Sequence, residues 1–560
     1  MKRSKLALYL AVILAVIFAI TGCVNARIPE EEEITEENKI DILRELDVSM
    51  YEMDLVEGEI PEKSDSSVNT FDYELPDIND YDVDVSGKTE NNVDIILSVE
   101  DNGSDIRELV KQVGESFNNQ HEDMSVTIRP LDPALAEDFI KSKAYVPQGY
   151  IASNELYGVL MKSNGINAEK VVPRLTGNTM GIAISDEKYT ELNNKYGDVT
   201  IESLVKANLD GEISIGYTNP TKNPTGLNFV LSMLASFDST NPNSIEASTD
   251  FSEFQNNVST VSYSTDQMLK AVEAGTINAF VIERQSFYAN LDSGFMYIPF
   301  GARHDYPLYK FENTTKEEEQ VLIEFAHFFN SSEVQDKATK LGFNKDEDFS
   351  GTVSPEDYPV GTVKEVLDFW KKSKSGNKDI VAVFVADVSG SMRDQNKLET
   401  LQQSLLNAMS YVSEDAEVGL ISYDEEMYLN LPIGKFDTKQ QKYFAGAVST
   451  MKEYGGGGTA TNNAILCAMN LISEREKSEG KEIKPIIILL SDGMTQSGYT
   501  LKSVESLIQK FNYPIYTIGY GDDADEKELK RISDINGGVY TNASTNDVGY
   551  TLKTIFNAEM

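Results

Sequence analysis

The chain has 560 residues, of which 40% are hydrophobic and 25% charged, and its formal net charge is −42. This length predicts more than one domain, and the excess of carboxylates argues against nucleic-acid binding, which depends on neutralising phosphates with Lys and Arg. The same carboxylates are available to hard divalent cations.

The first 23 residues predict a targeting segment. Three basic residues precede an uncharged apolar run at residues 6–20, which is too short for a comfortable membrane span. The run ends in ITGC (residues 20–23), which resembles a bacterial lipobox. The resemblance implies a signal peptide at residues 1–23 and a lipid on Cys23 that anchors the protein to the cell membrane on its extracytoplasmic face. The alternative is a plain signal peptide that contains a cysteine.

Residues 24–92 hold 22 Asp or Glu against 5 Lys or Arg and show little apolar periodicity. Such self-repelling composition predicts an acidic, disordered tether between the anchor and the folded part. A functional acidic binding segment is the alternative.

Strands and helices are predicted to alternate from residue 93 onward. An apolar strand (VDIILSV) precedes the helical pattern SDIRELVKQVGESF, and MSVTIRPL reads as a second strand. The stretches GYIASNELYGVLMKSNG and GEISIGYTNPTKNPTGLNFVLSMLASF repeat the strand–helix pattern. The alternation predicts α/β layers with parallel sheets, in which ligands lie beyond the carboxyl ends of strands.

Residues 93–345 resemble the type II periplasmic solute-binding proteins. The local matches are IGYTNPTKNPTGLNFVLSML and STDQMLKAVEAGTINAFVIERQSF. The resemblance implies two lobes with a solute cleft between them. The candidate solute-contacting residues end strands or open helices: Ser98, Ser153, Asn219, Thr225 and Gly226. Free N–H groups at the helix start near Thr225 would favour an anion or a carbonyl, although Thr225 and Ser153 also suit simple helix caps.

Residues 346–378 predict a linker followed by one amphipathic helix. Val363, Val366, Leu367 and Trp370 share a face of that helix. Trp370 is the only tryptophan, and we expect it to pack where the two domains meet.

Residues 379–560 predict a second α/β domain with a doubly wound, Rossmann-like sheet. Apolar strands such as DIVAVFVA and KPIIILL each end in a polar loop, and helical patterns follow the loops. No HExxH, CxxC, GxSxG or GxxxxGK[ST] motif occurs anywhere in the chain. The sequence therefore does not indicate most classes of hydrolase or nucleotide-binding protein.

Three of these strand-end loops carry oxygen ligands: Asp387, Ser389 and Ser391 in DVSGS, Thr459 after four glycines, and Asp492 in SDG. Two carboxylates and three hydroxyls, without imidazole or thiolate, suit a hard divalent cation rather than zinc. Mg²⁺ fits such a partly hydrated site best, with Mn²⁺ or Ca²⁺ as alternatives. Because the residues are predicted on surface loops, we expect the fold to survive their replacement.

The same five residues resemble the metal-ion-dependent adhesion site of von Willebrand factor A-type (VWA) domains. All five motif positions are filled in the family order. The resemblance implies that Ser389, Ser391 and Thr459 lie near the ion and that Asp387 and Asp492 contact it directly or through water. It also implies that an acidic group of a protein partner completes the coordination.

Two functions from different classes follow. The first is an anchored adhesion or assembly protein whose metal site grips a carboxylate of a protein partner. The second is a receptor for a small solute or anion that serves an ABC-type transporter or a sensor, with the VWA domain as a docking module. An enzyme is not expected, because no His or Glu base adjoins the metal motif in the sequence.

Overall fold

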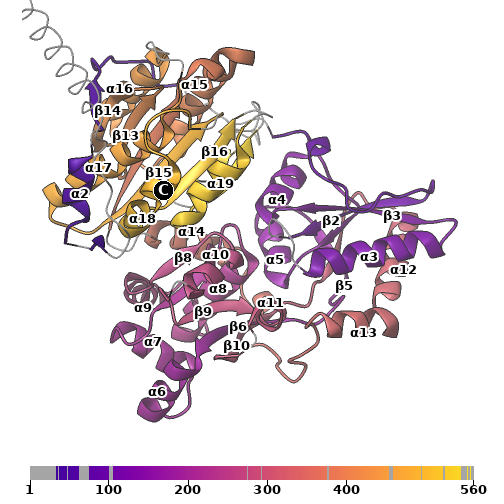
Figure 1. The fold of residues 1–560 in the computed structure, drawn as a ribbon. Coiled ribbons are helices and arrows are strands. Elements are labelled where there is room, and N and C mark those ends of the chain that lie inside the picture. Colours follow the sequence, from indigo (N-terminus) through magenta and orange to yellow (C-terminus); the bar gives the residue numbers. More distant parts are fainter. Residues whose placement is uncertain are drawn as a thin grey trace, which may run out of the picture. The chain divides into compact units, whose positions relative to one another are not determined.

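The computed structural model describes residues 33–35, 37–46, 48–61, 75–99, 105–273, 275–291, 293–374, 378–452, 458–492, 495–520, 524–543, 551, 552 and 555. The predicted signal peptide and Cys23 lie outside this range. Two compact units are present: residues 1–61 with 379–548, and residues 62–378 with 549–560 (Figure 1). Within the described residues, no helix combines the length and apolar character needed to cross a bilayer.

The first unit contains a seven-stranded sheet in the order β1-β14-β13-β12-β15-β16-β17. Its strands are β1 (Met50–Glu52), β12 (Asp379–Asp387), β13 (Glu417–Tyr423), β14 (Met427–Lys435), β15 (Ile483–Ser491), β16 (Ile515–Tyr520) and β17 (Tyr540–Ala543). Strand β12 pairs in parallel with both β13 and β15, so the chain order reverses beside it. In doubly wound sheets, the carboxyl ends of strands at such a switch point form the binding edge.

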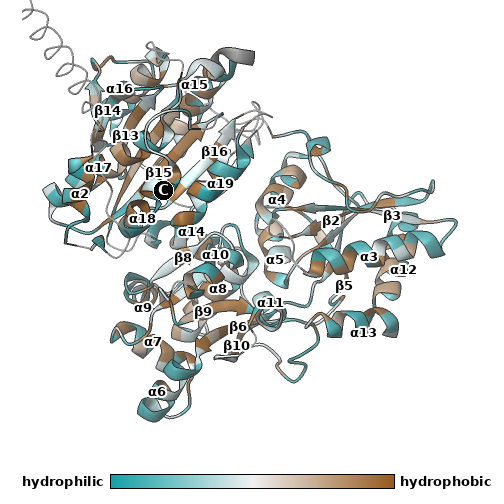
Figure 2. Ribbon diagram, in the orientation of Figure 1, coloured by the Kyte–Doolittle hydropathy of each residue, from teal (hydrophilic) through white to brown (hydrophobic). Residues whose placement is uncertain are grey.

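Helices cover both faces of this sheet. They are α15 (Lys397–Ala408), α16 (Thr438–Thr450), α17 (Thr461–Glu479), α18 (Leu501–Phe511) and α19 (Glu526–Ile535). In β12, Val383 and Val385 belong to the core that contains α17 and α18, whereas the intervening Phe384 stacks edge-on against Phe444 of α16. Because both faces are buried, β12 and β15 are apolar along nearly their whole length (Figure 2).

Part of the segment predicted as a disordered tether is folded. Helix α2 (Lys39–Glu45) packs on α17 and α18, with Leu43 only 1% exposed, and β1 adds a parallel strand to the edge strand β14. Residues 75–92 fold with the second unit, where Val85 bridges to Ile128 of its sheet. The prediction was wrong here because composition averages over the segment. A few apolar side chains are enough to fold an acidic segment onto a neighbouring surface that buries them.

The second unit has two lobes, each with a five-stranded sheet. The first lobe has the order β3-β2-β4-β11-β5 and the second β10-β6-β9-β7-β8. The first-lobe strands are β2 (Asn92–Ser98), β3 (Ser125–Leu131), β4 (Gly149–Ile151), β5 (Ala168–Val172) and β11 (Leu308–Phe311). The second-lobe strands are β6 (Thr179–Ser185), β7 (Ile215–Thr218), β8 (Thr260–Ser262), β9 (Ala279–Glu283) and β10 (Phe295–Arg303). The strands of the two lobes are therefore joined by two crossings, after β5 and after β10.

Helices follow the strands in both lobes, as predicted. The first lobe carries α3 (Asp105–Gln120), α4 (Pro133–Ser142), α5 (Glu155–Ser163), α12 (Lys316–Phe329) and α13 (Ser332–Lys340). The second carries α6 (Asp186–Tyr196), α7 (Ile201–Leu209), α8 (Pro224–Phe237), α9 (Ile245–Asn256), α10 (Thr265–Glu273) and α11 (Arg284–Asn290). The mixed α/β fold class predicted from the sequence is confirmed.

The predicted linker helix, α14 (Thr362–Ser373), belongs to the core of the second unit. It packs on α5, α8 and α9, and Trp370 is 1% exposed. The Trp370 indole N–H donates to the Tyr217 hydroxyl at 2.7 Å. Our expectation that Trp370 marks the meeting of two domains was therefore wrong, because an amphipathic pattern shows that a helix is buried but not against what.

Candidate functional site

Asp387 is the last residue of β12 and lies at the switch point of the first unit's sheet. Its Oδ1 accepts the Ser389 N–H at 2.9 Å, which makes the turn that follows the strand. Its Oδ2 accepts from the Ser491 hydroxyl at 2.7 Å and from the Tyr423 hydroxyl at 3.4 Å. Burial raises the pKa of Asp387 to about 6, although the hydrogen bonds from Ser389 and Ser491 oppose this shift.

The DVSGS loop reaches the end of the neighbouring strand β15. The hydroxyls of Ser389 and Ser391 are 3.3 Å apart, and the Ser391 hydroxyl donates to Asp492 Oδ1 at 2.7 Å. Four of the five predicted ligands are thus linked in one hydrogen-bonded set that joins residues about 100 positions apart in the sequence.

Thr459 is held at the same edge by its backbone. The N–H of the next residue, Ala460, donates to the carbonyl of Asp424, directly after β13, at 2.8 Å. The Thr459 carbonyl accepts the N–H of Gln496, which follows β15, at 2.8 Å. The predicted loop that carries Thr459 therefore contacts the segments that follow β13 and β15.

The predicted ligands are less exposed than the sequence suggested. Asp387, Ser389, Thr459 and Asp492 are all at most 3% exposed, and only Ser391 is exposed. The expectation of surface loops was wrong for the side chains, because each loop folds back over the strand ends. Replacing either carboxylate therefore affects a buried polar cluster.

One buried cation contacts this cluster and was missed in the sequence. Lys397 Nζ donates to Asp492 Oδ2 at 2.7 Å, and the side chains of this pair are 2% and 0% exposed. Lys397 is the first residue of α15, where the positive end of the helix dipole disfavours a cation. A lysine at the first position of a predicted helix, ten residues after Asp387, is the signal that could have indicated a buried ion pair.

The donor set fits a hard divalent cation. Its hydrogen-bonded members offer two carboxylates and two hydroxyls, the backbone of Thr459 lies at the same edge, and no imidazole or thiolate contacts these members among the described residues.

In the second unit, the structure brings Ser98 and Ser153 together. The Ser153 hydroxyl donates to the Ser98 carbonyl at 3.4 Å, where β2 and β4 end side by side. Asn219 follows β7 in the other lobe, and its Oδ1 accepts the N–H of Thr221 at 2.9 Å in a local turn. Both serines and Asn219 are buried.

Thr225 and Gly226 do not present free N–H groups. Their N–H groups donate to the Asn223 side chain, at 2.8 Å and 3.4 Å, so Asn223 caps α8. A Cβ on Gly226 would lie 1.9 Å from the Thr218 carbonyl oxygen. Gly226 therefore allows α8 to approach β7 closely, which explains a glycine here without a solute, and its contact with a solute stays a prediction. Ser153 is not a cap either, since Asn154 caps α5.

A buried polar network between the lobes was not predicted. His304, which follows β10, is 0% exposed, and its Nε2 accepts from the amides of Asn154 and Asn228 at 3.0 Å and 2.9 Å. Its Nδ1–H therefore donates to Glu283 Oε1, at 2.5 Å. Asn154 belongs to the first lobe and Asn228 to the second, so a single histidine joins them. Thr225 meets this network through a hydroxyl 3.5 Å from Glu283.

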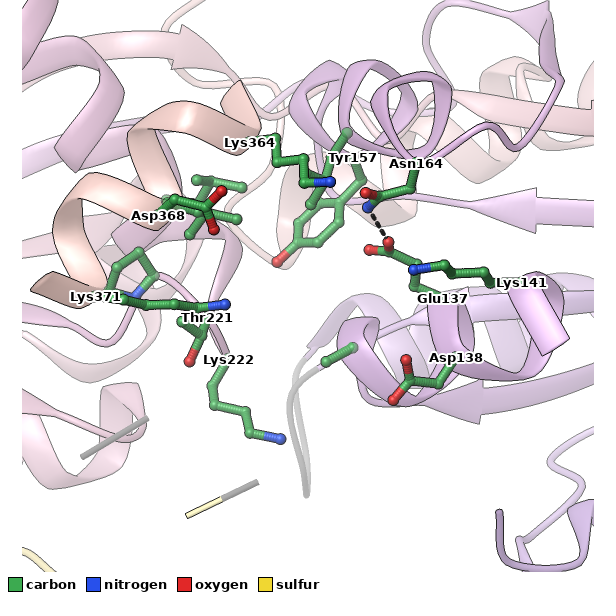
Figure 3. A pocket seen from close by; sticks show the side chains of 15 residues that line it. Glu137, Asp138, Lys141, Tyr157, Asn164, Thr221, Lys222, Lys364, Asp368 and Lys371 are labelled. Carbon is green, nitrogen blue, oxygen red and sulfur yellow. Dashed lines mark hydrogen bonds between the residues drawn. The ribbon is translucent and has the colours of Figure 1, made fainter. Parts of the chain in front are cut away.

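The second unit also contains a cavity of about 290 Å³ (Figure 3). Side chains from α4, α5, α14 and the turn before α8 line it, and four of them are lysines: Lys141, Lys222, Lys364 and Lys371. Burial raises the pKa of the lining residue Glu137, against the hydrogen bond from Asn164 and the charges of two lysines. None of the five predicted solute-contacting residues lines this cavity.

Comparisons with known proteins agree with the division of the chain into two units. Residues 380–558 match the von Willebrand factor type A domain, and residues 102–344 match the bacterial extracellular solute-binding protein family. Over 170 residues, the chain is 28% identical to inter-alpha-trypsin inhibitor heavy chain H6 from Homo sapiens, which covers 28% of this chain and 12% of that protein. The chain thus spans only a small part of that relative.

Two solved structures resemble one unit each. A putative extracellular solute-binding protein from Bordetella parapertussis is 13% identical and covers 51% of this chain and 99% of its own, with a TM-score of 0.38. Proximal thread matrix protein 1 from the mussel byssus, with a zinc-occupied MIDAS motif, is 19% identical and covers 32% of this chain and 47% of its own, with a TM-score of 0.28. The chain combines a domain of the bacterial extracellular solute-binding type with a von Willebrand factor type A domain.

Proposed function

We propose that this is an extracytoplasmic binding protein whose VWA domain holds one divalent cation and, through it, a carboxylate of a protein partner. Asp387, Ser389, Ser391, Thr459 and Asp492 would hold the ion, with Mg²⁺ preferred over Mn²⁺ or Ca²⁺. When bound, the ion would supply an electrophilic site for an acidic side chain. The proposed function is binding and not catalysis.

The observation that carries this proposal is the link from Ser391 to Asp492. It joins two loops that the sequence separates widely, at the switch point of a doubly wound sheet. Hydroxyls are weak ligands, so an ion held by three of them and two carboxylates keeps capacity for a further oxygen ligand.

Calorimetry of Mg²⁺ binding tests this proposal. We expect the parent protein to bind one Mg²⁺ and an Asp387→Asn, Asp492→Asn double variant to lose most of the affinity. Asparagine keeps the shape of each side chain, but its amide nitrogen cannot accept the hydrogen bond that the replaced carboxylate oxygen accepts. Far-UV circular dichroism must therefore show that the double variant is folded before its Mg²⁺ binding is compared. Undiminished Mg²⁺ binding by the folded double variant would contradict the proposal.

The location is proposed from the solute-binding family and from the lipobox-like ITGC. A domain of the extracellular solute-binding type indicates an extracytoplasmic location. We propose further that lipid on Cys23 anchors the protein to the membrane. A Cys23→Ser variant should leave the membrane fraction or remain unprocessed, and a variant that fractionated like the parent would contradict the anchor.

A second candidate function is solute reception, and the lysine-lined cavity favours it. The four lysines of the lining outnumber its three carboxylates, Glu137, Asp138 and Asp368, and a positive excess in a strongly acidic chain suits an anionic solute. A thermal-shift screen of the full chain against small organic and inorganic anions tests this candidate. Stabilisation by one anion that is lost in a Lys222→Met, Lys371→Met variant would support reception, since a ligand that binds the folded state raises its stability.

A further inference from the structure

Among the residues whose side chains the structure describes, the hydrogen-bonded set at the metal edge contains two carboxylates and one ammonium. Asp387 and Asp492 carry two negative charges, and Lys397 carries one positive charge in contact with Asp492. All three are at most 3% exposed, so their charges are poorly screened by solvent. Asp424, directly after β13, is also buried, but its carboxylate accepts from the Glu426 N–H and the Tyr428 hydroxyl in the turn before β14 and not from this set. Glu425 lies near Gly458 in the loop of Thr459, but its side chain is exposed.

Lys397 has a specific place in this cluster. It binds Oδ2 of Asp492, whereas Ser391 binds Oδ1 of the same carboxylate. Both oxygens of Asp492 are therefore engaged, and its charge is offset by a buried ammonium. Asp387, in contrast, accepts from neutral donors among the described residues.

We propose that Lys397 sets the charge of the metal site so that a bound divalent cation requires one external carboxylate for neutrality. This inference rests on the proposed metal-binding function. The two carboxylates and Lys397 together carry a charge of −1, so a divalent cation leaves +1, which one carboxylate of a ligand neutralises. Without Lys397, the same two carboxylates would neutralise the cation completely.

Two consequences follow from this charge balance. The buried ammonium repels the cation, so Mg²⁺ alone binds more weakly than the two carboxylates would allow. A monocarboxylate ligand and the cation each tighten the binding of the other. The cation leaves the site with a net charge of +1, and the carboxylate neutralises it. By linkage, an added carboxylate must tighten Mg²⁺ binding by the same factor as Mg²⁺ tightens carboxylate binding.

The test is calorimetric titration of Mg²⁺ into the full chain, in chloride buffer and again with acetate as the carboxylate probe. For the parent we expect acetate to tighten Mg²⁺ binding severalfold. For Lys397→Met, which removes the charge but keeps the length of the side chain, we expect Mg²⁺ alone to bind about tenfold more tightly and the acetate effect to disappear. Lys439→Met, which removes an exposed lysine on α16, should behave like the parent.

The outcomes separate this inference from the proposed function. If the parent itself binds no Mg²⁺, the proposed function fails and this inference fails with it. If the parent binds Mg²⁺ but Lys397→Met binds it equally or more weakly, only this inference is overturned, and Lys397 merely orients Asp492.

Loss of a buried ion-pair partner also affects folding, and this gives a second readout. In chelator, Lys397→Met should unfold at a lower temperature than the parent, and Mg²⁺ should raise its unfolding temperature more than that of the parent. If the variant fails to fold even in Mg²⁺, a cation does not replace the ammonium and the inference is overturned. Lys397→Gln, whose amide can still donate to Asp492, provides a neutral variant of better-preserved geometry, with the same expected direction for Mg²⁺ affinity.

Discussion

Both units place polar side chains at the carboxyl ends of parallel strands. Only in the first unit do most of the predicted site residues lie within hydrogen-bond distance of one another. In the VWA domain, loops after β12 and β15 meet directly, since these strands are neighbours in one sheet. In the solute-binding-type domain, the predicted residues come from two sheets in two lobes. There Ser98 meets Ser153 within one lobe, while Asn223 and not a solute satisfies the start of α8.

This difference shows when a strand-end pattern predicts a site. Adjacent strands of one sheet are about 5 Å apart, so their loops must meet. Strands of separate lobes are brought together by their connections, and here His304, on the connection after β10, contacts Glu283 at the end of β9 and two asparagines, one from each lobe. Glu283 and His304 also lie at strand ends, but no local pattern in the sequence shows that they meet a residue of the other lobe.

The largest expected effect concerns the ion pair of the metal edge. In chelator, Asp492→Ala should lower the free energy of unfolding of the VWA domain by about 3–5 kcal/mol, because it leaves the buried Lys397 without its carboxylate. Urea unfolding followed by circular dichroism measures this. Adding Lys397→Met to Asp492→Ala should recover part of the loss, whereas a loss below about 1 kcal/mol for Asp492→Ala alone would show that this edge is as tolerant as a surface loop.

The N-terminal segment should prove to be part of the VWA domain. Leu43→Ala should cost about 2–5 kcal/mol of that domain's stability, because the side chain is 1% exposed in the core shared with α17 and α18. Leu55→Ala, at a position 47% exposed in the same segment, should have little effect. Equal effects of the two substitutions in urea unfolding would mean that the segment does not pack as described.

The polar network between the lobes should stabilise the solute-binding-type domain. His304→Ala removes the acceptor of two buried amides and the donor to Glu283, and we expect a loss of about 2–4 kcal/mol. Trp370 is the only tryptophan and lies in this unit, so its fluorescence reports this unfolding separately. His327→Ala, at an exposed position of α12, is the matched control.

The smallest expected effect is at the start of α8. Gly226→Ala should cost about 1–3 kcal/mol, because the added Cβ would overlap the Thr218 carbonyl and push α8 away from β7. Trp370 fluorescence during urea unfolding measures this as well. Unchanged stability would return Gly226 to the role predicted from the sequence, that of leaving space at a cleft.

Sequence reasoning succeeded where a local pattern has only one way to fold. Runs such as VAVFVAD and PIIILLS are apolar on both faces and end in oxygen side chains, so a buried parallel strand followed by a polar loop was the natural interpretation. It failed at residues 33–61 and at α14. There the composition or the amphipathic face was read correctly, but the surface that buries these segments is formed by distant parts of the chain.

The sequence by itself determined the α/β class and the two domains and indicated the five candidate metal ligands, because hydrophobic periodicity and motif spacing are local properties. Only the tertiary structure decided that Lys397 pairs with Asp492, that Asn223 rather than a solute meets the start of α8, and that His304 joins the lobes. The physical reason is that a buried polar group must find a partner wherever the fold brings one within hydrogen-bond distance, and that partner can lie anywhere in the sequence.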